Sequence, residues 1–193
     1  GSTTSNLERQ KRVAFSPTLF VSGTRLLVRK GSPIQSFRDL AGKPVAVTAG
    51  TTNEKTMRDL SARFKLGLEL VVSRDHAESF ALVKSGKVEA FATDEVLLYG
   101  LIAQDRGSAQ GPTDYQVVGD FLSYDPYGVM YRKGDPEMAK VVNDTFQVLA
   151  EDGEIERQYK RWFLRKLPGG TSLDLPMSPQ LETIIQAMAI KAE

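Results

Sequence analysis

The chain has 193 residues, with 25 Lys and Arg against 24 Asp and Glu, one His and no Cys. A net charge of +1 excludes nucleic acid or an anionic membrane as a partner recruited mainly by charge. The lack of Cys excludes disulfides, thiolate nucleophiles and Cys-ligated metals, and a single His excludes multi-histidine metal sites, so we expect no metal and no cofactor.

Up to about residue 120, short apolar runs alternate with helical patterns. We expect strands at 24–30, 45–48, 68–72, 88–92 and 115–118. We expect one helical turn at 36–41, helices at 52–64, 76–85 and 94–104, and a surface loop at 105–114. Strands separated by helices of this length indicate βαβ units, and therefore an α/β fold with a mainly parallel sheet.

The pattern changes after residue 120. One strand at 127–133 is followed by predicted helices at 136–150, 154–164 and 179–191. A single strand needs a sheet to pair with, and we find no obvious partner for it in this sequence. No segment has the roughly 20 apolar residues that would span a bilayer, and residues 1–14 have no apolar core of a signal peptide.

Two threonines lie where a predicted strand meets a helix. Thr51 and Thr52 place hydroxyls and backbone N–H groups at a helix N-terminus, an arrangement that binds carboxylates or phosphates. The same residues could simply cap the helix, with Thr51 and Glu54 forming a capping box. Both interpretations remain open on spacing alone.

Three charged or titratable residues have two interpretations each. Asp94 follows a predicted strand, where it could hold an ammonium group or cap the next helix. His76 begins a helix after Asp75; it is either a surface residue or a functional one, and the helix dipole should favour its neutral ring. Arg9 lies in a polar basic run and is either solvated or a clamp for a carboxylate.

Taken together, the segments resemble a known family. They are Ser2-Thr3-Thr4, Glu8-Arg9-Gln10, Phe15-Ser16-Pro17, Arg25-Leu26-Leu27, Leu40-x-Gly42-Lys43, Gly50-Thr51-Thr52, residues 86–94, Tyr127-Gly128-Val129, Arg132-Lys133, and the stretch from Asp152-Gly153 to Trp162-Phe163. In this order they resemble the periplasmic solute-binding proteins of polar amino-acid ABC transporters, family 3. The segment Asp75-His76-Ala77-Glu78-Ser79-Phe80, with Arg9-Gln10-Lys11, is most similar to the glutamate/aspartate-binding branch.

The resemblance implies a type II periplasmic-binding-protein fold, in which two lobes close on a ligand. It implies that Arg9 clamps the α-carboxylate of the ligand, helped by Thr52, with Thr51 also counted among the ligand-binding residues. It implies an amino-acid carrier that delivers glutamate or aspartate to a membrane permease from the periplasm, and not an enzyme.

The other side of the ligand follows from the same resemblance. Asp94 would bind the α-ammonium group, joined by Ser2 and Thr4, and His76 would meet the side-chain carboxylate of an acidic ligand. An amino-acid zwitterion needs one cationic group and one carboxylate, so these residue types suit that ligand.

Members of the family usually carry a further N-terminal segment, so the resemblance implies one complete lobe and only the C-terminal part of the other. We expect a first-lobe ligand segment and hinge at 1–20, a complete second lobe at 21–121, and returning elements of the first lobe at 122–193. An incomplete lobe exposes apolar surface, so we expect self-association.

Two other function classes stay open. An enzyme on the same fold, such as a dehydratase or a peptidoglycan-cleaving relative, would need an acid or base with a shifted pKa, for which Asp94, Glu95 and His76 are the candidates. The ligand-sensing lobe of a transcription regulator would need a helix-turn-helix domain upstream.

Overall fold

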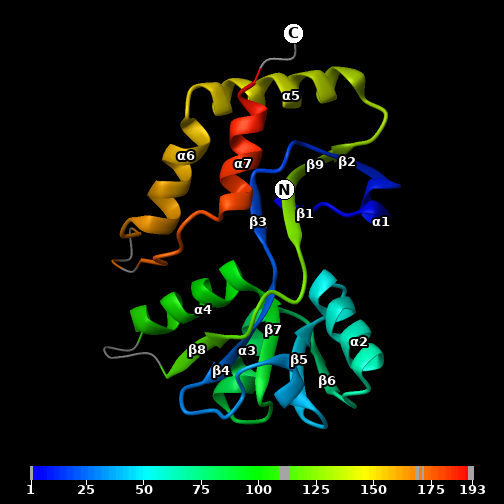
Figure 1. Cartoon of the computed structure of the whole chain (residues 1–193), viewed down its shortest axis with the longest axis vertical. Coiled ribbons are helices and arrows are strands. Elements are labelled where there is room, and N and C mark those ends of the chain that lie inside the picture. Colours follow the sequence, from blue (N-terminus) through cyan, green and yellow to red (C-terminus); the bar gives the residue numbers. More distant parts are fainter. Residues whose placement is uncertain (1, 109–113, 168–169, 171, 191–193) are drawn as a thin grey trace. The chain divides into compact units, whose positions relative to one another are not determined.

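The computed structural model describes residues 2–108, 114–167, 170 and 172–190, and Figure 1 shows the course of the chain. The chain divides into two compact units. The continuous unit is Gly23–Tyr124, and the split unit combines Gly1–Ser22 with Asp125–Glu193. These units meet after Ser22 and Tyr124, whereas the sequence predicted lobe boundaries after residues 20 and 121.

The continuous unit is built on a five-stranded sheet. Its strands, in the order β6-β5-β7-β4-β8, are Glu69–Ser73, Pro44–Thr48, Ala90–Asp94, Thr24–Arg29 and Tyr115–Val118. Strand β5 is parallel to β6 and β7, whereas β4 is antiparallel to β7 and β8. The predicted mainly parallel sheet is therefore wrong for β4. The segment between β4 and β5 contains only a 3₁₀ turn, Phe37–Leu40, and without a crossover helix the chain can reverse direction.

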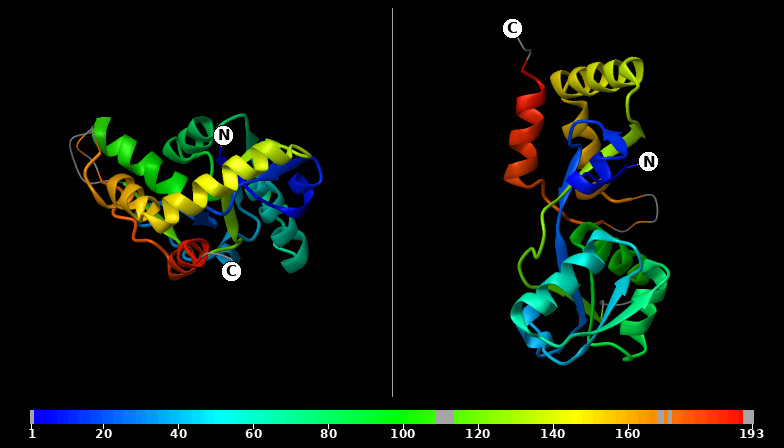
Figure 2. Two further views of the ribbon diagram at one scale, coloured as in Figure 1. Left: turned by 90° about the horizontal axis from the view of Figure 1, so that it is seen from above. Right: turned by 90° about the vertical axis from the view of Figure 1, so that its right-hand side faces the viewer.

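Helices cover both faces of this sheet (Figures 1 and 2). They are α2 (Thr52–Phe64), α3 (His76–Lys84) and α4 (Glu95–Ser108). Alternate strand residues point to opposite faces, so Val45 and Val47 pack with Met57 of α2 while Ala46 packs with Phe80 of α3. The predicted loop at 105–114 is wrong at its start, because α4 continues to Ser108; residues 109–113 lie outside the described part.

The split unit is organised around one long strand. Strand β9 (Asp125–Arg132) pairs antiparallel with three short strands, β1 (Ser2–Thr4), β2 (Val13–Phe15) and β3 (Phe20–Ser22). The expectation that this strand has no partner in the chain is therefore wrong. Its partners are three residues each, too short to show an alternating pattern in the sequence.

In the described part of the split unit, the α-helices are α1 (Leu7–Gln10), α5 (Pro136–Glu151), α6 (Glu154–Tyr159) and α7 (Pro179–Met188). The helix predicted at 154–164 changes at Lys160 into a π-helical turn, Lys160–Leu164, and the last helix ends at Met188. An aromatic cluster joins β3 to this region, with the Phe20 ring 5.8 Å from Tyr159 and 4.9 Å from Phe163.

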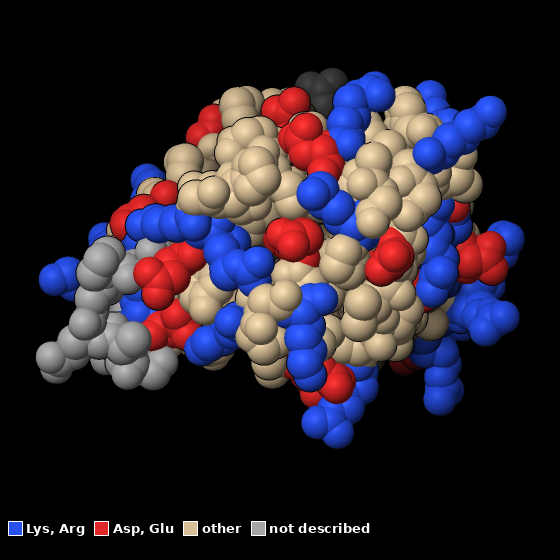
Figure 3. All heavy atoms as spheres, turned by 90° about the horizontal axis from the view of Figure 1, so that it is seen from below, with Lys and Arg blue, Asp and Glu red and all other residues tan. Residues whose placement is uncertain are grey.

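The face shown in Figure 3 carries Lys and Arg side chains interspersed with Asp and Glu side chains, with uncharged side chains between them. This mixture agrees with the near-zero net charge. Within the described part of the chain, no helix is long and apolar enough to cross a membrane, and no group of three or more His, Asp or Glu side chains is placed to hold a metal ion.

Candidate functional site

The carboxyl ends of three strands form a polar edge in the continuous unit. Thr48, Ser73 and Asp94 are the last residues of the mutually aligned strands β5, β6 and β7. All three side chains are buried. Open α/β sheets bind ligands outside this edge of their parallel strands, so the location agrees with a binding site.

Asp94 lies inside strand β7 and not after it, because the strand runs two residues further than the predicted 88–92. The residue is 4% exposed, and its Oδ1 accepts a hydrogen bond of 2.7 Å from Asn53 Nδ2. Asn53 was missed by sequence reasoning, since a polar residue in the first turn of a helix usually points to solvent. The hydrogen bond from Asn53 therefore helps to hold the Asp94 carboxylate in place.

The N-terminus of α2 shows which threonine caps it. Thr51 Oγ1 accepts from Glu54 N at 3.1 Å and donates to Thr48 O at 2.7 Å, so its hydroxyl is used by the turn. The predicted capping box is half correct, because Glu54 Oε2 accepts from Gly50 N at 2.8 Å and not from Thr51 N. The half-buried Thr52 is the first residue of the helix.

His76 is half-buried and not a surface residue. Its Nδ1 lies 2.7 Å from Thr48 Oγ1, which lies 3.0 Å from Ser79 Oγ. Burial lowers the pKa of His76 below its usual 6.5, and the negative charges of Asp94 and Asp75 oppose this shift. The neutral ring expected from the sequence is therefore favoured at neutral pH, with burial as the principal cause.

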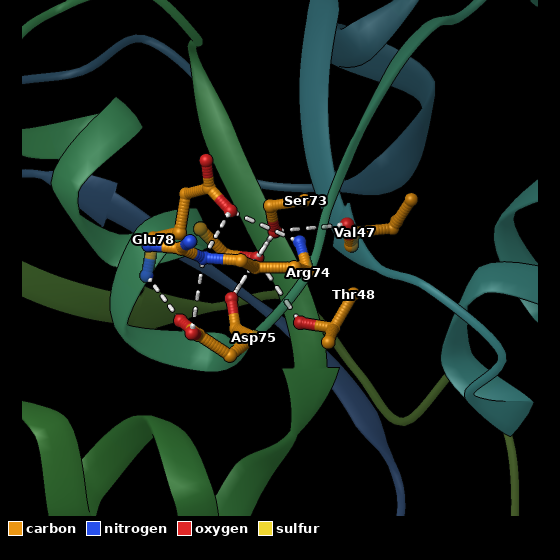
Figure 4. Close-up of polar contacts among 7 residues, drawn as sticks. Val47, Thr48, Ser73, Arg74, Asp75 and Glu78 are labelled. Atoms are coloured by element: carbon orange, nitrogen blue, oxygen red, sulfur yellow. Dashed lines mark hydrogen bonds and ion pairs between the residues drawn. The ribbon is translucent and has the colours of Figure 1, made fainter.

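A hydrogen-bonded turn joins β6 to α3 just before His76, and Figure 4 shows its residues Ser73, Arg74, Asp75 and Glu78. Asp75 Oδ1 caps α3 by accepting from Glu78 N at 2.8 Å, and Glu78 Oε2 accepts from Arg74 N at 3.0 Å. Ser73 Oγ lies 3.2 Å from Asp75 O and also contacts Ser79 Oγ. His76 follows directly after the capping residue Asp75 and is the first residue of α3. The turn before it and the helix after it therefore restrain its backbone.

Arg9, Ser2 and Thr4 lie in the split unit. Arg9 Nη1 donates to Thr3 Oγ1 at 2.9 Å and to Thr4 O at 2.8 Å, so its guanidinium is held against β1 and is not simply solvated. Thr4 is 7% exposed and Ser2 is exposed. A shallow hollow of about 430 Å³ lies beside them, lined by Ser2, Thr3, Arg9, Arg12, Val13 and Met130.

The seven candidate residues thus form two groups. Thr51, Thr52, His76 and Asp94 gather at the polar edge of the continuous unit, and Ser2, Thr4 and Arg9 gather around β1 and α1 of the split unit. One group supplies a carboxylate and an imidazole, and the other supplies a guanidinium.

Glu95, the third candidate for a catalytic acid or base, forms an ion pair with Arg25. Arg25 Nη1 lies 2.5 Å from Glu95 Oε1, and Arg25 Nε donates to Gly119 O at 2.8 Å. Both side chains are largely buried, so Glu95 is engaged in an internal ion pair. This arrangement does not favour Glu95 as a catalytic base.

Comparison with known proteins identifies a family that matches most of the chain. The family model for "bacterial extracellular solute-binding proteins, family 3" matches residues 1–165. The chain is 40% identical over all 193 residues to the glutamate/aspartate import solute-binding protein of Salmonella typhimurium. It is 42% identical over the same length to the L-glutamate/L-aspartate-binding protein of Pseudomonas aeruginosa. It spans 63% of the length of each.

Among solved structures, an ancestral arginine-binding protein bound to arginine superposes with a TM-score of 0.73 and 31% identity, covering 83% of this chain and 68% of that one. An ancestral arginine-binding protein bound to glutamine superposes with a TM-score of 0.73 and 31% identity, covering 84% of this chain and 68% of that one. The proteins named here are described by what they bind and not by a reaction. The comparisons therefore favour a binding protein over an enzyme.

Proposed function

Because the chain belongs to family 3 of the bacterial extracellular solute-binding proteins and has their type II periplasmic-binding-protein fold, we propose that it binds L-glutamate or L-aspartate. In this proposal the amino acid is bound in the periplasm and passed to the permease of an ABC transporter. The observation that carries it is the buried Asp94 carboxylate beside His76 at the polar edge.

The charges of the two residue groups match those of an amino-acid zwitterion. Asp94 would accept from the α-ammonium group, together with Ser2 and Thr4. Arg9 would bind the α-carboxylate, because its contacts with Thr3 and Thr4 leave a guanidinium of fixed orientation. Thr52 would add a donor at the N-terminus of α2, while Thr51 supports that turn through its capping bonds.

His76 would bind the side-chain carboxylate of an acidic ligand. In this proposal Thr48 Oγ1, 2.7 Å away, donates to Nδ1, so that the ring proton of neutral His76 lies on Nε2 and can be donated to a carboxylate. A bound carboxylate also favours the charged ring, so it would oppose the effect of burial on the pKa of His76. An amide such as that of glutamine would not produce this change.

Calorimetry tests the proposal. We expect L-glutamate or L-aspartate to bind with a Kd near the micromolar range, about −8 kcal/mol, and L-glutamine and L-arginine to bind more weakly. Asp94→Asn should weaken binding about 10- to 100-fold, since it removes a hydrogen bond between charged groups. Lys55→Gln, on the exposed side of α2, is the matched control and should leave the Kd unchanged. Tighter binding of L-glutamine or L-arginine would contradict the proposed ligand class.

We also propose that the chain self-associates. Helix α5 carries a stripe of exposed apolar side chains, Met138, Val141 and Val148, which are 45%, 61% and 52% exposed. The three lie on one side of the helix, and the net charge of +1 provides little repulsion between copies. A second copy of the chain is the occupant that we propose for this stripe.

A further inference from the structure

The side chain of Asn53 is buried at the polar edge, although it belongs to the first turn of α2. It is 3% exposed. Its Nδ2 donates to Asp94 Oδ1 at 2.7 Å and to Thr24 Oγ1 at 2.8 Å, and its Oδ1 accepts from Thr93 Oγ1 at 3.3 Å. Both amide hydrogens and the carbonyl oxygen therefore have partners inside the protein, which compensates for burying the group.

The chemistry of the partners fixes the orientation of the amide. An ionised Asp94 carboxylate can only accept hydrogen bonds, so the NH₂ end of Asn53 must face it. Thr24 and Asp94 are opposite each other in the antiparallel pair β4–β7. The amide therefore bridges a cross-strand pair from a third element, α2, and the flipped amide would place its oxygen against the carboxylate.

Thr24, the second residue that accepts a hydrogen bond from Asn53 Nδ2, is itself held by hydrogen bonds to Ser123. Thr24 N donates to Ser123 Oγ at 2.9 Å, and Thr24 Oγ1 lies 2.7 Å from the same atom. The neighbouring backbone approaches so closely that a Cβ at Gly23 would lie 2.3 Å from Ser123 O. A continuous series of hydrogen bonds thus connects Ser123 through Thr24 and Asn53 to Asp94.

We propose that Asn53 is a positioning residue for amino-acid binding, which fixes the Asp94 carboxylate so that it meets the α-ammonium group of the ligand. The inference rests on the proposed function, because it requires Asp94 to bind that group. A neutral amide is suited to this role: it restrains the carboxylate without cancelling its charge. A Lys or Arg at the same place would compete with the ammonium group for Asp94.

Two ligands that differ in the ammonium group alone provide the test. Glutarate has both carboxylates of L-glutamate but no ammonium group, so the ratio of the two affinities reports on Asp94. For the wild-type chain, we expect calorimetry to show L-glutamate binding at least tenfold more tightly than glutarate. For Asn53→Leu, L-glutamate affinity should fall about tenfold or more while glutarate affinity changes less than threefold.

A purely structural role would not change this ratio. Met57→Val serves as the matched control, because Met57 lies one turn further along the same face of α2, is fully buried and belongs to the apolar core. This variant should lower the stability and keep the wild-type ratio. Asn53→Ala is the second variant, which removes the donor to Asp94 without adding a larger side chain, and it decides the question if Asn53→Leu does not fold.

These measurements distinguish a failure of the proposed function from a failure of the proposed role of Asn53. If the wild-type chain binds neither ligand, or binds both equally, the proposed function of the site fails and the role of Asn53 fails with it. If the wild-type chain prefers L-glutamate and the folded Asn53 variants keep that preference, only the role of Asn53 is wrong. An equal loss of both affinities in these variants would also overturn it.

Discussion

The continuous unit and the split unit both contain a sheet and helices, but their cores are very different. The two apolar clusters of the described chain both belong to the continuous unit, one on each face of its sheet. Among the described residues of the split unit, the buried apolar side chains are Phe20, Ala150, Tyr159, Leu181 and Ile185. The continuous unit therefore has a core typical of an independently stable domain, and the split unit has much less apolar burial.

This difference extends to the proposed site. Asp94 and His76 are supported by buried hydrogen-bond networks that reach into α2, β4 and α3. Arg9 is held by Thr3 and Thr4 on a strand of three residues, at the surface of the split unit. Asp94 and His76 are thus held more rigidly within the continuous unit than Arg9 is within the split unit.

The largest effect is expected from Phe91→Ala. Phe91 is fully buried in the continuous unit, so its truncation should lower the free energy of unfolding of that unit by about 3–5 kcal/mol. Far-ultraviolet circular dichroism during denaturation measures this loss. Trp162, the single Trp of the chain, lies in the split unit, and its fluorescence transition should not change.

Phe163→Ala is the reciprocal variant for this test. Phe163 belongs to the aromatic cluster of the split unit, so its removal should move the Trp162 transition first. Equal displacement of both transitions by both variants would show that the two units unfold as one cooperative body, contrary to our comparison.

The sequence predicted the continuous unit better than the split unit, for a physical reason. Strands β5 and β8 lie where apolar runs place them, because alternating or β-branched segments buried on both faces produce a strong local pattern. The partners of β9 could not be recognised, since three-residue strands are defined by pairing with a distant segment and not by local preference. The reversal of β4 was missed for the same reason.

The site shows a similar limit. Asp94 and His76 could be selected by residue type and by their place near a strand end and a helix start, and the capping role of Thr51 could be predicted from spacing. Asn53 could not, because its role depends on three contacts with residues that are far from it in the sequence. A polar residue in the first turn of a helix, on the side that faces the sheet, is the signal that could have identified Asn53.

A smaller effect is expected from pH, again confined to the continuous unit. Burial holds the pKa of His76 below 6.5 in the folded chain, opposed by Asp94 and Asp75. Between the folded and unfolded pKa values the unfolded chain binds more protons, so stability should fall as the pH drops through about 6.5 and then level off. Nuclear magnetic resonance of this single His measures the folded pKa, and denaturation monitored by circular dichroism measures the loss.

His76→Gln is the control for the pH dependence. It should remove the loss of stability near pH 6.5, while the Trp162 transition of the split unit stays unchanged in both proteins. Saturating L-glutamate should raise the pKa of His76 in the wild-type chain, and L-glutamine should not, if a ligand carboxylate meets the ring. A folded pKa above 6.5 without ligand would contradict the assigned burial effect.

The smallest effect on stability is expected at the exposed stripe of α5 in the split unit. Val141 is 61% exposed, so Val141→Lys should change the free energy of unfolding by less than about 0.5 kcal/mol. It should nevertheless reduce self-association measured by light scattering over a range of concentrations, because a charge interrupts the apolar stripe. Asn143→Lys adds the same charge on another side of α5 and should leave self-association as in the wild type. A wild-type chain that stays monomeric at high concentration, or equal effects of the two variants, would show that the stripe is not an interface between copies.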